Sequence, residues 1–222
     1  MFKADAEEAV PICDRILNFM LAATATTGRT GSDFRTAIGD FLADAQHIIQ
    51  DDLAGPPLAD IFDKARLAGV TQKQLTQTRV EAAKETPATV GATLIRDSLI
   101  NFSLATEGRI IADMTFTSRD DVEALNLIMN KAFQDPQEIA ADSMDQQTFR
   151  ALVELHAAIS FHLVQTARPL PRMLEFQFAV SMPTLVTAYR LYADAGRADE
   201  LRLENKVVHP GFMLPYGRAL GN

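Results

Sequence analysis

Few residues of this sequence stand where their types and spacing could support catalysis. The side chains most often used for nucleophilic, acid–base or metal chemistry are one cysteine, Cys13, and four histidines, His47, His156, His162 and His209. Cys13 falls on the apolar side of an expected helix, so we interpret it as a buried structural thiol rather than a nucleophile. A single cysteine also cannot form a disulfide within the chain.

The histidines do not form a pattern that suggests a metal site. His156 and His162 are six residues apart on an expected helix, so their side chains project in different directions and cannot share a metal ion directly. We expect one of them to be half-buried and the other exposed. His209 precedes a Pro-Gly turn, and no nucleophile or carboxylate is evident beside it, which favours a packing or hydrogen-bonding role.

The acidic doublets Asp51-Asp52 and Asp120-Asp121 are equally poor candidates for carboxylate-pair or metal chemistry. Adjacent helix residues diverge by about 100°, and Asp120-Asp121 falls at an expected helix start, where acidic side chains interact favourably with the helix dipole. The sequence contains no G-x-x-x-x-G-K-[ST], G-x-G-x-x-G, G-x-S-x-G or H-E-x-x-H motif. We therefore predict no enzyme activity, no catalytic, cofactor-binding or metal-binding residues, and no cofactor.

Amphipathic helices are expected to dominate residues 1–168, because apolar residues recur there with helical spacing. The predicted helices run from about Asp5 (or Pro11) to Thr26, from Ser32/Asp33 to Ile49, from Leu58 to Ala68, from Pro87 past Ile110, and from Ser118 to Asp135 (or Ala141). A last long helix begins at Gln146 and runs past Leu163, and Pro169 and Pro171 close it. Thr71-x-x-Gln74 and Ser118-x-x-Asp121 are capping-box patterns. The polar stretch from Thr71 to Lys84 predicts a poorly packed helix or a mobile connection.

The pattern changes after Pro171. Residues 173–180 alternate, which predicts a half-buried strand with Leu174, Phe176, Phe178 and Val180 on its inner face. A helix from Met182-Pro183 to Tyr192, a second helix from Asp199 to Asn205 and a very short final strand from Arg218 to Asn222 should follow. The predicted fold class is therefore mainly α: a helical body over residues 1–168 and a small α+β module over residues 169–222.

Charge divides the chain at nearly the same place. The formal net charge is -8, but residues 168–222 contain seven Arg and Lys against five Asp and Glu, which gives +2 and leaves -10 on the preceding 167 residues. An acidic chain binds duplex DNA weakly without help, because phosphate binding requires Lys and Arg that release counterions. The most apolar early stretch, Ala9–Ala25, carries Asp14 and Arg15, so we expect no membrane-spanning or targeting segment.

The end of the chain resembles a LysM module, which has the order strand, helix, helix, strand. The resemblance rests on the alternating strand, Leu185 and Ala188, then Leu201, Asn205 and the spaced prolines and glycine, Pro210, Pro215 and Gly217. We expect Leu185, Ala188 and Leu201 to pack on the inner face of the strand. Asn205 is expected at the helix C-cap, because asparagine tolerates left-handed backbone and its amide satisfies nearby backbone groups.

A wider set of motifs resembles the C-terminal region of the DNA circularisation (DNA circulation) proteins of Mu-like contractile-tailed phages and prophages. The matching runs are Met114–Leu125, Leu170-Pro171-Arg172, Phe176-x-Phe178, Pro183-x-Leu185, Tyr189–Tyr192 with Asp194, Arg197–Leu201, Asn205 and His209–Phe212. The resemblance covers roughly residues 95–217, about half of the chain. The motifs are specific as a set, although each one alone is weak.

This resemblance implies a structural virion protein of a phage tail. The expected role is a baseplate or hub-proximal component of a contractile tail or related particle, made in the host cytoplasm and assembled into the virion. The implied partners are other baseplate, hub or tail-tube proteins and further copies of this chain in a symmetric ring. The family's name refers to an N-terminal domain that we do not expect in this sequence, so a separate chain carrying that domain is a further expected partner.

Two other functions remain open. The LysM resemblance suggests peptidoglycan binding, but glycan-binding LysM modules begin with a Gly-Asp-Thr/Ser turn, and this chain has Ser181-Met182-Pro183-Thr184 there. The family name suggests DNA handling, which the acidic charge disfavours. Neither a membrane nor nucleic acid is expected as a partner.

Overall fold

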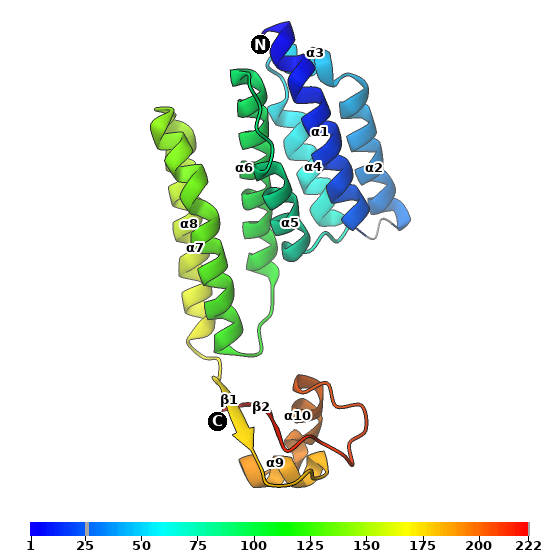
Figure 1. Ribbon diagram of the computed structural model, residues 1–222, viewed down its shortest axis with the longest axis vertical. Coiled ribbons are helices and arrows are strands. Elements are labelled where there is room, and N and C mark those ends of the chain that lie inside the picture. The colour runs from blue at the N-terminus through cyan, green and yellow to red at the C-terminus, as the bar shows by residue number, and fades with distance from the viewer. Residues whose placement is uncertain (25–26, 222) are drawn as a thin grey trace. The chain divides into compact units, whose positions relative to one another are not determined.

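The helical spacing of the sequence is realised as helices along most of the chain. The computed structural model describes residues 1–24 and 27–221, and it is mainly helical with one two-stranded antiparallel sheet near the C-terminus (Figure 1). The elements are α1 (Lys3–Ala23), α2 (Gly28–Ala43), α3 (Ala45–Gln50), α4 (Gly55–Leu67), α5 (Gln72–Ala83), α6 (Val90–Asp113), α7 (Arg119–Asp142), α8 (Gln146–Ala167), β1 (Met173–Gln177), α9 (Thr184–Tyr192), the 3₁₀ turn η1 (Ala195–Arg197), α10 (Ala198–Glu204) and β2 (Tyr216–Leu220). None of the described helices combines the length and apolar character needed to cross a bilayer.

The chain divides into two compact units. The body unit comprises Met1–Met114 and Met129–Ile159, and the C-terminal unit comprises Thr115–Ile128 and Ser160–Asn222. The division passes through α7 and α8, so each unit contains one part of both helices. The domain boundary that we predicted after residue 168 stays a prediction.

Helix α6 lies at the centre of the body unit, where it packs against α1, α4 and α5 (Figure 1). Its apolar residues are spread around the helix rather than gathered in one stripe, as expected for a helix that packs against several others. Leu99, Leu104 and Ile111 are fully buried. Phe102 stacks on Phe62 of α4, with 5.9 Å between the ring centroids. The core of this unit therefore forms around this central helix.

The prediction of a poorly packed or mobile segment between Thr71 and Lys84 was wrong. This segment forms α5, whose N-terminus has the predicted capping box between Thr71 and Gln74. Leu75, Thr78 and Ala82 are buried on the side that faces the other helices. A helix with so few large apolar residues can still pack closely, because small side chains allow the near approach of α6.

Several predicted helix boundaries also need correction. Helix α2 begins at Gly28, so Ser32 and Asp33 lie inside it rather than at its start. Helix α6 begins at Val90 rather than Pro87, because the Thr89 hydroxyl accepts a hydrogen bond from the Ala92 N–H at 3.3 Å and caps the helix there.

The remaining differences concern helix ends and breaks. The predicted helix up to Ile49 is divided between α2 and α3. Helix α1 ends at Ala23, and the predicted end at Thr26 lies outside the described residues. The alternative of a longer α7 is confirmed, because it continues past Pro136 to Asp142.

A buried carboxylate joins α5 to α6. Glu107 is completely buried, and its carboxylate accepts hydrogen bonds from Arg79 Nε at 3.2 Å, Thr76 Oγ1 at 2.9 Å and Gln72 Nε2 at 3.2 Å. Burial raises the pKa of Glu107, although Arg79 and the hydrogen bonds act in the opposite direction. The desolvation of this charge therefore outweighs the interactions that favour it.

This arrangement makes the stability of the fold depend on pH with a definite sign. The folded-state pKa of Glu107 lies above its usual value of 4.5. At pH values between the unfolded-state pKa and the folded-state pKa, the folded protein therefore holds a proton that the unfolded chain has lost. The stabilising contribution is fully present below the unfolded pKa and is lost as pH rises through the folded pKa.

We therefore expect the unfolding free energy of the wild type, measured relative to that of Glu107→Gln, to fall as pH rises from about 4.5 and then to level off. Urea titrations of both proteins over a series of pH values measure this difference. A difference that stays constant or grows with pH would contradict the interpretation.

Candidate functional site

The C-terminal module, defined here as residues 173–220, is built from β1, α9, η1, α10 and β2. β1 and β2 pair antiparallel, from Met173 opposite Leu220 to Gln177 opposite Tyr216. The two helices between the strands contribute to a small shared core, which contains Phe176, Ala188, Leu201, Met213 and Ala219. Partners far apart in sequence therefore hold this short segment together.

The predicted core of the module was correct only in part. Ala188 and Leu201 pack with Phe176 as expected. Leu174, Val180 and Leu185 were expected to be buried with them, but their side chains are exposed. The reason is the size of the module: the strand ends at Gln177, before Val180, and two short helices cover only the middle of a two-stranded sheet.

Asn205 joins the end of α10 to β2. Its amide nitrogen donates to the carbonyl oxygens of Leu201 at 2.8 Å and Arg218 at 2.7 Å, and its amide oxygen accepts from the Arg218 N–H at 2.7 Å. The prediction of a C-cap with backbone hydrogen bonds is confirmed, but Asn205 has a φ of -92°, so it is not left-handed. The left-handed residue is Lys206, with a φ of 52°.

The close approach of Asn205 to β2 requires a glycine. A Cβ atom at Gly217 would overlap the Asn205 side-chain oxygen and lie 2.9 Å from the Phe176 ring. The final strand begins at Tyr216, two residues earlier than predicted, and the predicted end at Asn222 lies outside the described residues. Gly217 therefore stands within β2, opposite Phe176, where it leaves room for Asn205.

Hydrogen bonds also join the two long connections of the module, residues 178–183 and 205–215. Ser181 Oγ donates to the Met213 carbonyl at 2.6 Å, and the Met213 N–H donates to the Met182 carbonyl at 3.0 Å. The Thr184 N–H donates to the Pro210 carbonyl at 2.8 Å. The ring of His209 accepts from the Gly211 N–H at 3.1 Å, which confirms the hydrogen-bonding role predicted for this histidine.

The module exposes many large apolar side chains. Leu185, Val186 and Tyr189 lie together on the solvent side of α9, opposite the buried Thr187 and Ala188. In the second connection Val208 is 95% exposed and Phe212 is 77% exposed. Exposed apolar residues in this number on so short a segment are typical of a surface that contacts another molecule.

Some of the basic side chains of the module are also available at its surface. Arg197 pairs with Glu200 at 2.7 Å and stacks over the Tyr192 ring, with 3.7 Å between its Cζ atom and the ring centroid. Two other cations of the module, Arg190 and Lys206, are exposed and form no ion pair within the described part of the chain. The surface of the module therefore combines exposed apolar side chains with unpaired cations.

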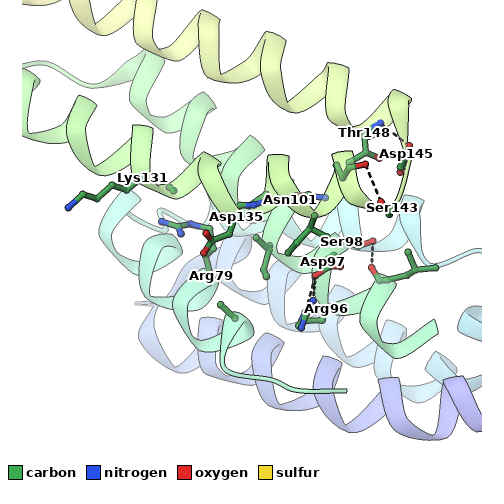
Figure 2. A pocket seen from close by; sticks show the side chains of 17 residues that line it. Arg79, Arg96, Asp97, Ser98, Asn101, Lys131, Asp135, Ser143, Asp145 and Thr148 are labelled. Carbon is green, nitrogen blue, oxygen red and sulfur yellow. Dashed lines mark hydrogen bonds and ion pairs between the residues drawn. The ribbon is translucent and has the colours of Figure 1, made fainter. Parts of the chain in front are cut away.

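A second candidate site is a groove of about 250 Å³ in the body unit, lined mainly by α5, α6 and α7 (Figure 2). Arg96 and Asp97 pair at 2.7 Å on its wall, and the side-chain amide of Asn101 makes no hydrogen bond with the described residues. Lys131 extends away from the groove in Figure 2. Sequence reasoning missed these residues, because they lie on three helices and leave no local pattern.

The groove lacks the arrangement that catalysis requires. The described residues that line it include no cysteine or histidine. The Ser98 and Ser143 hydroxyls donate to backbone carbonyl oxygens. The carboxylate beside Thr148 is that of Asp145, and its hydrogen bonds with Thr148 lower the pKa of Asp145, which makes it a weak general base. Its acidic and basic side chains are mixed, which defines no class of ligand. We therefore regard the surface of the C-terminal module as the better candidate site.

The residues that the sequence analysis considered for chemistry lie apart from one another. Cys13 is fully buried, and desolvation raises its pKa to about 12, so the thiol is not a nucleophile near neutral pH. His156 lies 2.8 Å from the Asn130 amide oxygen and stacks on Phe133. His162 was expected to differ from His156 in exposure, but both are half-buried. Among the described residues no three His, Cys, Asp or Glu side chains gather as metal ligands would.

Comparison with known proteins adds no assignment. No model of a protein family matches the sequence, and no curated protein matches it significantly.

We expect Asn205→Ala to destabilise the C-terminal module by about 2 kcal/mol, because it removes three hydrogen bonds and leaves the Arg218 backbone without these partners. Limited proteolysis with mass spectrometry measures this effect as faster cleavage in residues 205–215. Asn101→Ala is the matched control, since the Asn101 amide has no such partner. Equal cleavage rates in both variants would show that the three Asn205 hydrogen bonds do not stabilise the module.

Proposed function

We propose that this protein is a structural component of a contractile phage tail or a related particle, placed in the baseplate or near the hub. The observation that carries the proposal is the set of motifs over residues 95–217 that resembles the C-terminal region of the Mu-like DNA circularisation proteins. Its activity is binding: contacts with other baseplate, hub or tube proteins and with further copies of itself. The assignment rests on analogy with that family rather than on site chemistry.

The architecture of the C-terminal module supports this proposal. The order β1, α9, α10, β2 and the antiparallel pairing of β1 with β2 are those of a LysM-like module. Asn205, Gly217, Ala188 and Leu201 all have structural roles there. We therefore propose a LysM-like fold for this module and a docking role for its surface.

The chemistry of the module surface fits docking on a protein. Leu185, Val186 and Tyr189 form an exposed apolar face on α9, and Arg190 adds a cation beside it. Buried apolar area supplies most of the free energy of protein association, and charges at the rim give orientation and speed. An acidic partner surface with apolar pockets would complement this face.

Two alternatives require separate tests. Glycan binding through the LysM-like module predicts that the purified chain sediments with peptidoglycan. The connections 178–183 and 205–215 are hydrogen-bonded to each other. The sequence lacks the Gly-Asp-Thr/Ser turn of glycan-binding LysM modules, and this favours a protein partner over a glycan. A role in DNA handling predicts a gel shift at moderate salt, which the net charge of -8 disfavours.

We expect purified particles to contain this chain in a fixed stoichiometry that matches a ring. Quantitative mass spectrometry of gradient-purified particles measures the ratio to the tube protein. The proposal would be wrong if the chain occurs in the cell lysate and never in particles.

Substitution of a residue on the exposed α9 face tests whether this face is needed for incorporation of the chain into particles. Leu185→Asp should reduce incorporation at least tenfold, because it places a charge in the proposed contact. Leu67→Asp is the matched control: Leu185 is 59% exposed and Leu67 is 60% exposed, but Leu67 lies on α4 of the body unit. Equal incorporation of both variants, with both folded, would contradict a docking role for α9.

A further inference from the structure

The two edges of the β1–β2 sheet differ in their free hydrogen-bonding groups. The Gly221 N–H donates to the Arg172 carbonyl, and the Phe178 N–H donates to the Pro215 carbonyl. In this register, residues 172, 174, 176 and 178 therefore direct their backbone N–H and C=O groups toward β2. In an antiparallel pair the residues between them direct their N–H and C=O groups outward. These outward residues are 173, 175 and 177 on β1 and 216, 218 and 220 on β2.

Side chains occupy the outer edge of β2. The Asn205 amide both donates to the Arg218 carbonyl and accepts from the Arg218 N–H, at 2.7 Å each, as a neighbouring strand would. Arg197 Nη2 donates to the Leu220 carbonyl at 3.3 Å. A further strand cannot pair with β2 without displacing these groups.

The outer edge of β1 is open over two residues. The Met173 N–H donates to Asp120 Oδ2 at 2.6 Å, which closes the beginning of the strand. The backbone groups of Glu175 and Gln177 form no outward hydrogen bond with any described residue. Leu174, on the helix-facing side, is 56% exposed beside this edge. Unpaired edges of this kind are templates for another strand.

We infer that β1 pairs antiparallel with β1 of a second copy of the chain, about a two-fold axis at Phe176. Glu175 of each copy then lies opposite Gln177 of the other, and their outward N–H and C=O groups form four hydrogen bonds. The two sheets become one four-stranded sheet. This contact goes beyond the proposed function, because it names one surface through which copies of the chain meet.

The side chains on both faces favour this register. On the open face each Glu175 lies opposite a neutral Gln177, whereas a register centred on residue 175 would place the two Glu175 carboxylates opposite each other, which is unfavourable. On the helix-facing side the exposed Leu174 lies opposite Phe178 of the other copy. Phe178 is half-buried and lies 5.6 Å from Phe176 between ring centroids, so Leu174 would extend an existing apolar cluster.

Self-complementarity identifies the occupant as a second copy. The open segment offers two hydrogen-bonding residues, which match the same two residues of another β1 across the two-fold axis. Its helix-facing side is apolar at 174, 176 and 178, and so is the strand it would receive. An isologous contact with these properties closes after two copies.

Opposite substitutions at one position test the contact in the purified full-length chain. Gln177→Lys creates two Lys–Glu pairs across the axis, and Gln177→Glu creates two Glu–Glu pairs. Sedimentation equilibrium at low salt should give a dimer dissociation constant about tenfold higher for Gln177→Glu than for Gln177→Lys, with the wild type between them. Equal dissociation constants, or a wild type that stays monomeric at millimolar concentration, would overturn the inference.

Cross-linking tests the register and does not depend on the stability of the charged variants. A mixture of Glu175→Cys and Gln177→Cys chains should form disulfide-linked dimers under mild oxidation, and each variant alone should not; Cys13 is buried and does not compete. Cross-linking of one variant alone, or none in the mixture, would refute this register. If particles contain the chain but no such cross-link forms within them, the contact is wrong and the proposed function stands.

Discussion

A two-stranded sheet has two edges, and the Asn205 amide determines which of them is free. By pairing with both backbone groups of Arg218, Asn205 supplies the hydrogen bonds that a third strand would otherwise supply. The same side chain holds the end of α10, so one amide stabilises the module and closes its β2 edge. Because of these Asn205–Arg218 hydrogen bonds, the module is stable without a third strand beside β2. The surfaces that stay free for contact with another molecule are the outer edge of β1 and the exposed face of α9.

The body unit depends on a different interaction, the buried Glu107 carboxylate and its partners on α5. A charge in the interior costs stability unless it is hydrogen-bonded, and Glu107 has three partners on one neighbouring helix. These hydrogen bonds join α5 to α6 in addition to the packing of the buried Leu75, Thr78 and Ala82. The two units thus use the same device, a polar side chain that satisfies partners on a neighbouring element.

Sequence reasoning predicted the elements well where the signal was local. The capping pair Thr71 and Gln74, the helix α8, the alternating strand and the C-cap at Asn205 were all evident from neighbouring residues. It failed where contacts between residues far apart in the sequence determine packing and exposure. The packing of α5 depends on Glu107, which is 28 residues from Arg79, and the exposure of Leu174 and Leu185 depends on how little surface two short helices can cover.

The candidate surface could be predicted only in outline for the same reason. Alternation placed Leu174, Phe176 and Phe178 on one face, but no local pattern shows that Asn205 closes one edge and leaves the other open. Hydrogen exchange of single backbone amides tests this account most directly. In the dilute full-length chain the Arg218 amide should be protected, while the Glu175 and Gln177 amides exchange freely and gain protection as concentration rises. Free exchange at Arg218, or protection of Glu175 and Gln177 that does not change with concentration, would contradict it.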